Sequence, residues 1–282
     1  MRRLTYKNPK GEEVEFYLNP FLINSLEGIG EVEADTQTQK SPYQDGESYI
    51  ESYLQPRFID MEGQILKRDK KEIREHRRII TRTVNPKYGL GRITFDLDGE
   101  TFVIDAVPEG IPSFPERSMD VWQKFQISWF CPDPYWRSTN NESKALQAYV
   151  GNFKLPMTFP FMLGTSGSST TLYNDGDAPA PVQIEINGPI TNPQIFNRTT
   201  GESMRINRTI DKGEVLRIDT TPGRKSITVE GADGVKQAFG HLDSESTLWK
   251  LATGENRIEH VADSGNRQAE VIVRWGNRYS GV

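Results

Sequence analysis

The sequence predicts a mainly β protein of two domains, with one α-helix in the first half. Its 282 residues exceed the roughly 100–200 that one domain usually holds. It carries 13 Phe, 10 Tyr and 17 Pro, a mixture that favours short strands joined by many turns. Apolar residues alternate with polar ones in several short segments, and a single segment has helical spacing.

The chain opens with a strand, a turn and a second strand. The turn is Asn8-Pro9-Lys10-Gly11, in which proline fixes the second position and glycine closes the loop. It joins the predicted strands 4–7 and 14–18. Glycines and prolines then divide the chain into short extended pieces, of which residues 48–59 are the richest in Tyr, Ile, Leu and Phe.

A helix is predicted over residues 69–82. Asp69 and Glu72 have the spacing of a capping box, in which side chains satisfy the first backbone N–H groups. The segment ends before Asn85-Pro86, because proline disfavours helix at the preceding residue. A narrow apolar seam repeats every seven residues and consists of Leu66, Ile73 and Ile80.

A β-hairpin follows the predicted helix. Its turn is Asp98-Gly99, a pair that readily adopts the positive φ angles of a tight hairpin. The alternating apolar positions on its two strands are Ile93, Phe95, Leu97, Phe102, Ile104 and Ala106. A further strand is expected over 119–131, ended by two prolines that cannot donate to a sheet. One face of that strand carries Val121, Phe125, Ile127 and Trp129.

The domain boundary is predicted just after Trp136, giving domains 1–137 and 138–282. Residues 138–176 are polar, and 164–171 are rich in Gly and Ser, as linkers are. The second domain has no helical pattern, and its short apolar runs are separated by turn residues. This predicts a β-sandwich or jelly roll. The runs are 182–186, 203–207, 214–219, 226–229, 248–251, 256–261 and 269–275.

Composition and motifs argue against several classes of function. The net charge of −5 disfavours a general nucleic-acid binder, and no apolar run approaches the ~18 residues of a membrane span. The single cysteine, Cys131, excludes an intrachain disulfide and a four-cysteine metal site. No phosphate-binding, dinucleotide or paired-histidine motif occurs. We therefore expect no catalytic residues, no metal and no cofactor, although a glycosidase pair of carboxylates stays open.

Two features admit more than one interpretation. Residues 67–82 hold eight Lys or Arg and three Asp or Glu. That basic surface could face a polyanion, pair across a subunit boundary, or simply be solvated, and composition favours the last. In the second domain, Trp249 and Trp275 could stack on sugar rings, but core or edge packing is favoured for both.

Several motifs together resemble the siphophage distal tail protein family. The most specific is the strand that ends in the corner Asp133-Pro134-Tyr135-Trp136. The first half also contributes Leu26-Glu27-Gly28-Ile29-Gly30, Arg57-Phe58-Ile59, the charged helix and the hairpin. In the second half the resembling segments are 174–181, 192–193, 197–202, 213–219 and 254–258, and the chain ends with 275–282.

The resemblance implies an N-terminal domain that closes into a homohexameric ring and a galectin-like C-terminal β-sandwich outside it. Such a ring joins the tail tube protein to the tail-associated fibre or lysin protein, and its lumen passes the tape measure protein and then DNA. The resemblance also implies a virion tail-tip location, assembly in the host cytoplasm, no membrane contact and no enzymatic activity. Whether two rings stack back to back stays open.

On that reading, the basic helix faces the lumen or a neighbouring subunit. The candidate residues are Arg74, Arg77, Arg78 and Arg82. Two other functions stay open. One is a host-glycan-binding module that acts in adsorption through the C-terminal sandwich. The other, with less support, is a cell-wall glycosidase, since a sandwich fold does not by itself imply a function.

Overall fold

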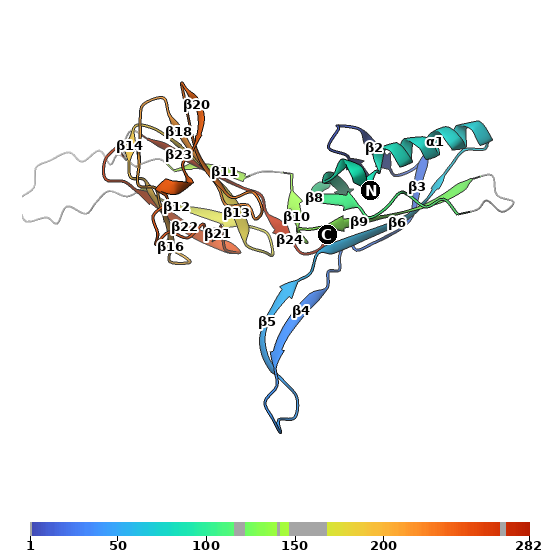
Figure 1. Ribbon diagram of the computed structural model, residues 1–282, viewed down its shortest axis with the longest axis horizontal. Helices are drawn as coiled ribbons and strands as arrows, with labels where there is room; N and C mark the ends of the chain where they lie inside the picture. The colour runs from blue at the N-terminus through green and yellow to red at the C-terminus, as the bar shows by residue number, and fades with distance from the viewer. Residues whose placement is uncertain (1, 116–121, 140–141, 147–167, 266–268) are drawn as a thin grey trace, which may run out of the picture. The chain divides into compact units, whose positions relative to one another are not determined.

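The computed structural model describes residues 2–115, 122–139, 142–146, 168–265 and 269–282. The chain forms two compact units (Figure 1). The first contains Met1–Thr139 together with Tyr279–Val282, and the second contains Asn140–Arg278. The four C-terminal residues, which the sequence analysis assigned to the second domain, therefore belong with the first unit. Within the described residues, no helix is long and apolar enough to cross a membrane.

The first unit is built on an antiparallel sheet with the strand order β2-β1-β7-β8-β9-β6-β3. Strand β10 pairs with β8 at its side. The bounds are β1 (Arg2–Lys7), β2 (Glu13–Phe16), β3 (Phe21–Glu27), β6 (Arg57–Ile65), β7 (Gly91–Leu97), β8 (Glu100–Pro108), β9 (Gln123–Cys131) and β10 (Trp136–Ser138). Buried aromatic and aliphatic side chains from the two halves of this sheet form one continuous core.

The predicted helix is present as α1 (Lys70–Thr83), followed by the 3₁₀ turn η1 (Pro86–Tyr88). The Asp69 carboxylate caps it by accepting hydrogen bonds from the backbone N–H groups of Lys71 and Glu72, at 2.8 and 3.1 Å. Ile73 and Ile80 are buried as the seam predicts. Leu66 lies before the helix and is half-buried, so the seam is shorter than expected.

The predicted hairpin is confirmed as β7 and β8, with Leu97 opposite Glu100. Asp98 and Gly99 both have positive φ, at 51° and 101°. Two positive φ values at the centre of a two-residue loop match the twist of the strands. The next strand, β9, begins at Gln123, and residues 119–121 of the predicted strand lie outside the described residues.

A second hairpin, of β4 (Ala34–Gln39) and β5 (Ser48–Leu54), projects from the first unit (Figure 1). Its strands pair only with each other. Every residue of β4 is exposed, and so is every residue of β5 except Leu54, which is half-buried. The sequence indicated one extended run over 48–59, but Gln55 and Pro56 separate β5 from β6. The β4–β5 hairpin is an arm that adds nothing to the core.

Arg57 is the most unusual buried residue of the first unit, with only 1% of its surface exposed. Its guanidinium donates hydrogen bonds to backbone carbonyl oxygens of three separate segments. The distances are 2.8 Å to Pro134, 2.6 Å to Gly28, 3.0 Å to Ile29 and 2.8 Å to Glu31, and a further bond reaches Ser280. Five donors in a planar fork suit such a cluster of carbonyls.

Close backbone approach around Arg57 requires glycine at two positions. Gly28 has φ +77°, and a Cβ built there would lie 1.8 Å from the carbonyl oxygen of Phe58. A Cβ on Gly281 would lie 2.4 Å from the carbonyl oxygen of Gly30. The ring of Tyr279 packs edge-on against Phe102, with centroids 5.5 Å apart. These contacts hold the C-terminal tail against the first unit.

The second unit is a β-sandwich of two main antiparallel sheets. One has the order β11-β23-β13-β18-β19-β20 with β21 beside β13, and the other has the order β12-β22-β15-β16. Side chains from both sheets share one core. The bounds are β11 (Glu142–Leu146), β12 (Ser168–Asn174), β13 (Ala180–Asn187), β15 (Gln194–Asn197), β16 (Glu202–Arg205), β18 (Val215–Asp219), β19 (Ser226–Gly231), β20 (Gly234–Gln237), β21 (Lys250–Leu251), β22 (Gly254–Val261) and β23 (Glu270–Trp275).

The remaining elements are small. A two-stranded sheet pairs β14 (Ile190–Thr191) with β17 (Thr209–Ile210), η2 is Phe239–His241 and β24 is Arg278–Tyr279. Strand β12 occupies part of the segment predicted as a Gly/Ser linker. Leu172 of that strand is 1% exposed and belongs to the core, although Ser and Thr surround it in sequence. Residues 164–167 of the predicted linker lie outside the described residues.

We predict that Arg57→Met destabilises the protein by about 3–5 kcal/mol, because several buried carbonyls lose their donor together. Urea unfolding followed by circular dichroism measures this. The control is Arg92→Met, since Arg92 is 54% exposed in its pair with Asp105 and should cost less than about 1 kcal/mol. Equal losses in the two variants would contradict the role assigned to Arg57.

We predict that Cys131 is unreactive in the folded protein. Burial raises the pKa of its thiol to about 12, against the opposing influence of the Arg57 charge. The reactive thiolate therefore forms only as the pH approaches that value. At pH 8, alkylation by iodoacetamide should be at least ~100-fold slower in native protein than in urea-unfolded protein. Comparable rates in the two states would show that the thiol is accessible.

Candidate functional site

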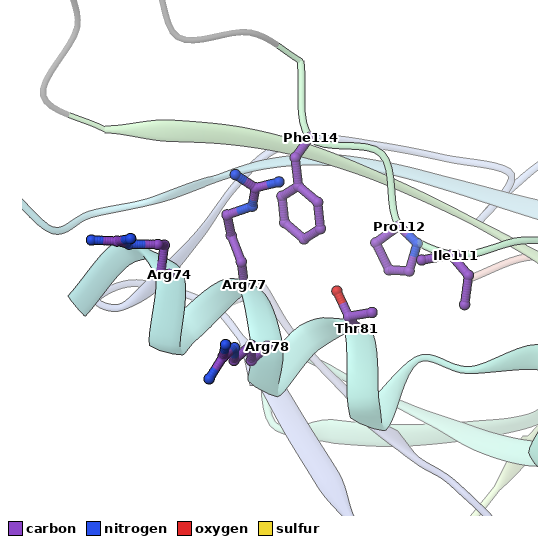
Figure 2. A pocket seen from close by; sticks show the side chains of 7 residues that line it. All are labelled: Arg74, Arg77, Arg78, Thr81, Ile111, Pro112 and Phe114. Atoms are coloured by element: carbon purple, nitrogen blue, oxygen red, sulfur yellow. The ribbon is translucent and has the colours of Figure 1, made fainter. Parts of the chain in front are cut away.

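The first candidate surface is a hollow between α1 and the segment after β8. It has a volume of about 490 Å³. Three arginines of the helix, Arg74, Arg77 and Arg78, line it. Figure 2 shows Arg77 extending toward Phe114 and Arg78 pointing away from it. The residues that complete its lining are Thr81, Ile111, Pro112 and Phe114. The hollow thus combines cationic side chains with an apolar wall.

The arginines of this hollow are not neutralised by neighbouring carboxylates. Within the described residues, no Asp or Glu oxygen lies within 4.0 Å of the guanidinium of Arg74, Arg77 or Arg78. Arg77 instead lies over the ring of Phe114, 4.6 Å from its centroid. Such a cation–π contact leaves the outward N–H groups of the guanidinium available.

Arg82 lines a second hollow beside α1, together with Arg78. Its Nε lies 3.0 Å from a carboxylate oxygen of Glu12, so it forms an ion pair within its own chain. A pair between Glu75 and Arg78 is not among the ion pairs of the described residues. Near Glu72, His76 Nδ1 is 2.7 Å from the backbone carbonyl oxygen rather than from the carboxylate. Arg74, Arg77 and Arg78 thus line the first hollow, while Arg78 and Arg82 line the second.

The second candidate surface is the β4–β5 hairpin, which sequence reasoning missed. Four of its large side chains are strongly exposed: Tyr43 at 108%, Tyr49 at 66%, Ile50 at 59% and Tyr53 at 54%. Exposed apolar groups that gather on one element mark an interaction site. The sequence does contain a local pattern that could have indicated this exposed hairpin. Several aromatic residues stand among acidic ones between two turns, at 42–46 and 55–56.

The corner that carried the family resemblance has a structural position. Asp133 accepts a hydrogen bond from the N–H of Tyr135 at 3.4 Å, which shapes the turn. The Pro134 carbonyl accepts from Arg57. Trp136 is fully buried, and its Nε1 donates to the carbonyl of Ile29 at 3.0 Å. The residues of this motif therefore have a structural role, because they pack around Arg57.

The two tryptophans considered for sugar stacking are both buried. Trp249 is 1% exposed and donates through Nε1 to the carbonyl of Ile195 at 3.3 Å. Trp275 is 5% exposed and lies in the same core. A hollow of about 300 Å³ reaches the edge of Trp249, but neither residue offers a ring face to a ligand. Core packing, the interpretation that the sequence favoured, agrees with this burial.

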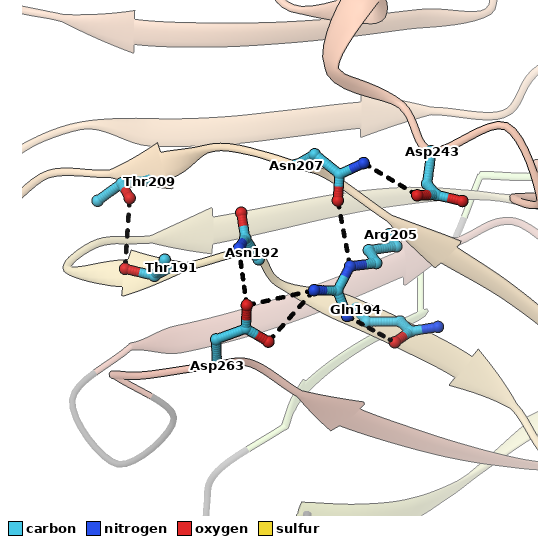
Figure 3. Close-up of polar contacts among 8 residues, drawn as sticks. All are labelled: Thr191, Asn192, Gln194, Arg205, Asn207, Thr209, Asp243 and Asp263. Atoms are coloured by element: carbon cyan, nitrogen blue, oxygen red, sulfur yellow. Dashed lines mark hydrogen bonds and ion pairs between the residues drawn. The ribbon is translucent and has the colours of Figure 1, made fainter.

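A polar network lies on the second unit around Arg205 (Figure 3). Its guanidinium donates to the Asn207 side chain at 3.1 Å and to both carboxylate oxygens of Asp263 at 3.2 Å. Asn192 donates to Asp263 at 2.7 Å, and Asn207 donates to Asp243 at 2.9 Å. The Asn192 amide and then the Arg205 charge hold the pKa of Asp263 below its usual range. The members of this network satisfy one another.

Metal-binding geometry is not found in the part of the chain that the structure describes, where no three His, Cys, Asp or Glu side chains gather around a common point.

Comparison with protein families gives two matches, which together span most of the chain. Residues 10–131 match the phage tail protein RIFT-related domain, and residues 175–279 match the C-terminal domain of the siphovirus-type tail component. No curated protein matches the sequence.

Solved structures share the fold over the full length. One is the Dit protein of phage SPP1, described as a paradigm of the hub adsorption apparatus in phages that infect Gram-positive hosts. It is 12% identical, with a TM-score of 0.70 and 99% of each chain covered. Two further ones are the phage P2 baseplate in its activated conformation with Ca and with Sr. Each is 10% identical, with a TM-score of 0.56 and both chains fully covered.

The two matched domains, in this order on one mainly β chain, define a structural component of a siphophage tail. The chain belongs to the siphophage distal tail protein family, whose members are hub proteins of the tail tip. The resemblance in the sequence is thereby confirmed.

We predict that Arg205→Met raises the pKa of Asp263 toward the ordinary aspartate value near 3.9, because it removes a favourable charge from the ionised form. The network stabilises the folded state at pH values above the ordinary aspartate pKa. This stabilisation is lost as the pH falls through the lower pKa that Asp263 has in the folded protein. An NMR titration of the carboxyl group measures the shift. The control is Arg198→Met, which breaks a separate pair with Glu259. An equal shift in both variants would contradict this assignment.

Proposed function

We propose that this chain closes into a homohexameric ring that joins the tail tube protein to the tail-associated fibre or lysin protein. The tape measure protein and then DNA pass through its lumen. The protein acts mechanically, as a connector, and not as an enzyme. Assembly takes place in the host cytoplasm. Back-to-back stacking of two such rings requires self-complementary outer faces. Family membership and the hub structures that share its fold support this proposal.

The observation that carries ring closure is the β4–β5 hairpin. A two-stranded hairpin without a packing partner is marginal in water. This one exposes three tyrosines and an isoleucine that no part of its own unit covers. A neighbouring subunit would bury them. Contact between an arm and a different surface on the next copy is heterologous. Such contacts generate a ring when the rotation from each subunit to the next closes on itself.

A host-glycan-binding role for the C-terminal sandwich has less support. Its two candidate stacking residues are in the core, and stacking needs an exposed ring face. The glycosidase alternative has no specific observation in its favour. The ring connector is therefore the function that the geometry supports best.

The proposal is tested by removing the arm. The backbone N–H of Gln55 donates to the carbonyl of Glu33 at 2.8 Å, so deletion of 34–54 joins chain ends that are already adjacent. We expect the full-length protein to have a mass of six or twelve subunits by light scattering, and the deletion variant to be a monomer. The melting temperature should change by no more than a few degrees, because the deleted residues lie outside the core.

A second variant keeps the hairpin and replaces Tyr43, Tyr49 and Tyr53 with Ser, which should also reduce assembly. The matched control places the same number of Ser substitutions at exposed apolar residues of the second unit: Tyr173, Val235 and Phe239. That control should assemble as the wild type does. A deletion variant that still forms rings would contradict closure through the hairpin.

A further inference from the structure

We infer that the β4–β5 hairpin of one subunit docks in the basic hollow beside α1 of the next subunit. This inference rests on the proposed ring and names the two surfaces that close it. It assigns a ligand to the hollow lined by Arg74, Arg77 and Arg78: an acidic, tyrosine-rich arm of a second copy of the same chain.

The charges of the two surfaces are complementary. Between Ala34 and Leu54 the hairpin carries one lysine, Lys40, and no arginine. Its carboxylates are Asp35, Asp45, Glu47 and Glu51, which gives the hairpin a net charge of −3. None of them forms an ion pair with a described Lys or Arg. The hollow presents three guanidiniums, a charge of +3 that is likewise uncompensated within the described residues.

The apolar parts of the two surfaces are complementary as well. The hollow is walled by Ile111, Pro112 and Phe114, and Ile111 is 55% exposed. The hairpin offers Tyr43 at its tip and Tyr49 and Ile50 on β5. Tyrosine and arginine are the residues that most often anchor protein interfaces, because they combine a large contact area with polar groups. A purely solvated helix face would not need an apolar wall.

The geometry within one subunit separates the arm from its own hollow. The hairpin extends from one side of the first unit's sheet, and α1 lies on the opposite side (Figure 1). The arm therefore cannot reach its own hollow. Each subunit offers one arm and one hollow, so every copy both inserts and receives. This is the heterologous arrangement that a closed ring requires.

The orientation of the arm is fixed at its base. Arg57 begins β6 directly after the arm, and its guanidinium binds the carbonyl of Glu31 just before the arm. Both stems thus meet at one buried side chain. A firmly held base gives the arm a defined direction from the sheet, which a heterologous contact repeated around a ring needs.

The test is a charge reversal and its compensation in full-length protein. The first variant is Arg74→Glu, Arg77→Glu and Arg78→Glu. It should weaken subunit association by at least tenfold, seen by light scattering as a shift of assembly to higher concentration. The second variant adds Asp45→Lys, Glu47→Lys and Glu51→Lys to the same chain. It should recover assembly, because both surfaces now have reversed signs.

The matched control reverses three exposed cations of the second unit, Lys212→Glu, Arg224→Glu and Lys225→Glu, which gives the same change in net charge. It should assemble as the wild type does. Assembly of the wild type should also weaken as salt rises from 0.05 to 1 M, because the Debye length, over which charges interact, shortens several-fold in that range.

The outcomes separate this inference from the ring itself. If the wild type forms rings and the arginine reversal leaves them unchanged, the hollow is not the docking site, although the ring proposal stands. Unchanged rings with a lower phage titre would assign the arginines to the lumen and overturn the inference in the same way. Loss of assembly that the compensating variant does not recover would also overturn it. A monomeric wild type would contradict the proposed ring.

Discussion

The buried guanidinium of Arg57 is the interaction on which the first unit depends. An isolated charge in a protein interior is strongly unfavourable, so it must be fully hydrogen-bonded or it will not be tolerated. Here the partners are backbone carbonyls from the segments near Gly28, Pro134 and Ser280. Desolvation lowers the pKa of Arg57, although arginine stays protonated at physiological pH. The backbone carbonyls of those segments stabilise the buried charge.

That requirement connects parts of the chain that lie far apart in sequence. The strand corner at 133–136, the loop at 28–31 and the C-terminal tail all supply backbone to the same side chain. Trp136 completes the arrangement through its bond to Ile29. The motifs by which the family was recognised are therefore largely the residues that build this buried centre, and not residues of a catalytic site.

The same centre sets the base of the β4–β5 hairpin, and so it links stability to assembly. The arm leaves the sheet immediately beside Arg57 and carries its tyrosines and carboxylates away from the core. The helix with its arginines lies across the sheet. One unit therefore presents two opposed, complementary surfaces, which is the arrangement expected of a subunit that repeats around an axis.

The sequence by itself determined the local elements and the family. Asp69 and Pro86 delimit α1, and Asp98-Gly99 defines a hairpin, because capping and turn geometry depend on neighbouring residues. It did not reveal β12, whose Ser- and Thr-rich strand is held by pairing with β22, 80 residues or more further along the chain. Nor did it reveal that three arginines share a hollow while Arg82 pairs with Glu12.

Only the tertiary structure decided which charges are compensated and which surfaces remain uncovered. From the sequence, Trp249 and Trp275 could each be a core residue or a sugar-stacking residue, and their burial decided for the core. Arg57 entered the sequence analysis only through the motif Arg57-Phe58-Ile59, and nothing in that motif indicates that its guanidinium is buried. The physical reason is the same in each case: burial and ion pairing arise from contacts between distant segments, and local sequence does not encode those contacts.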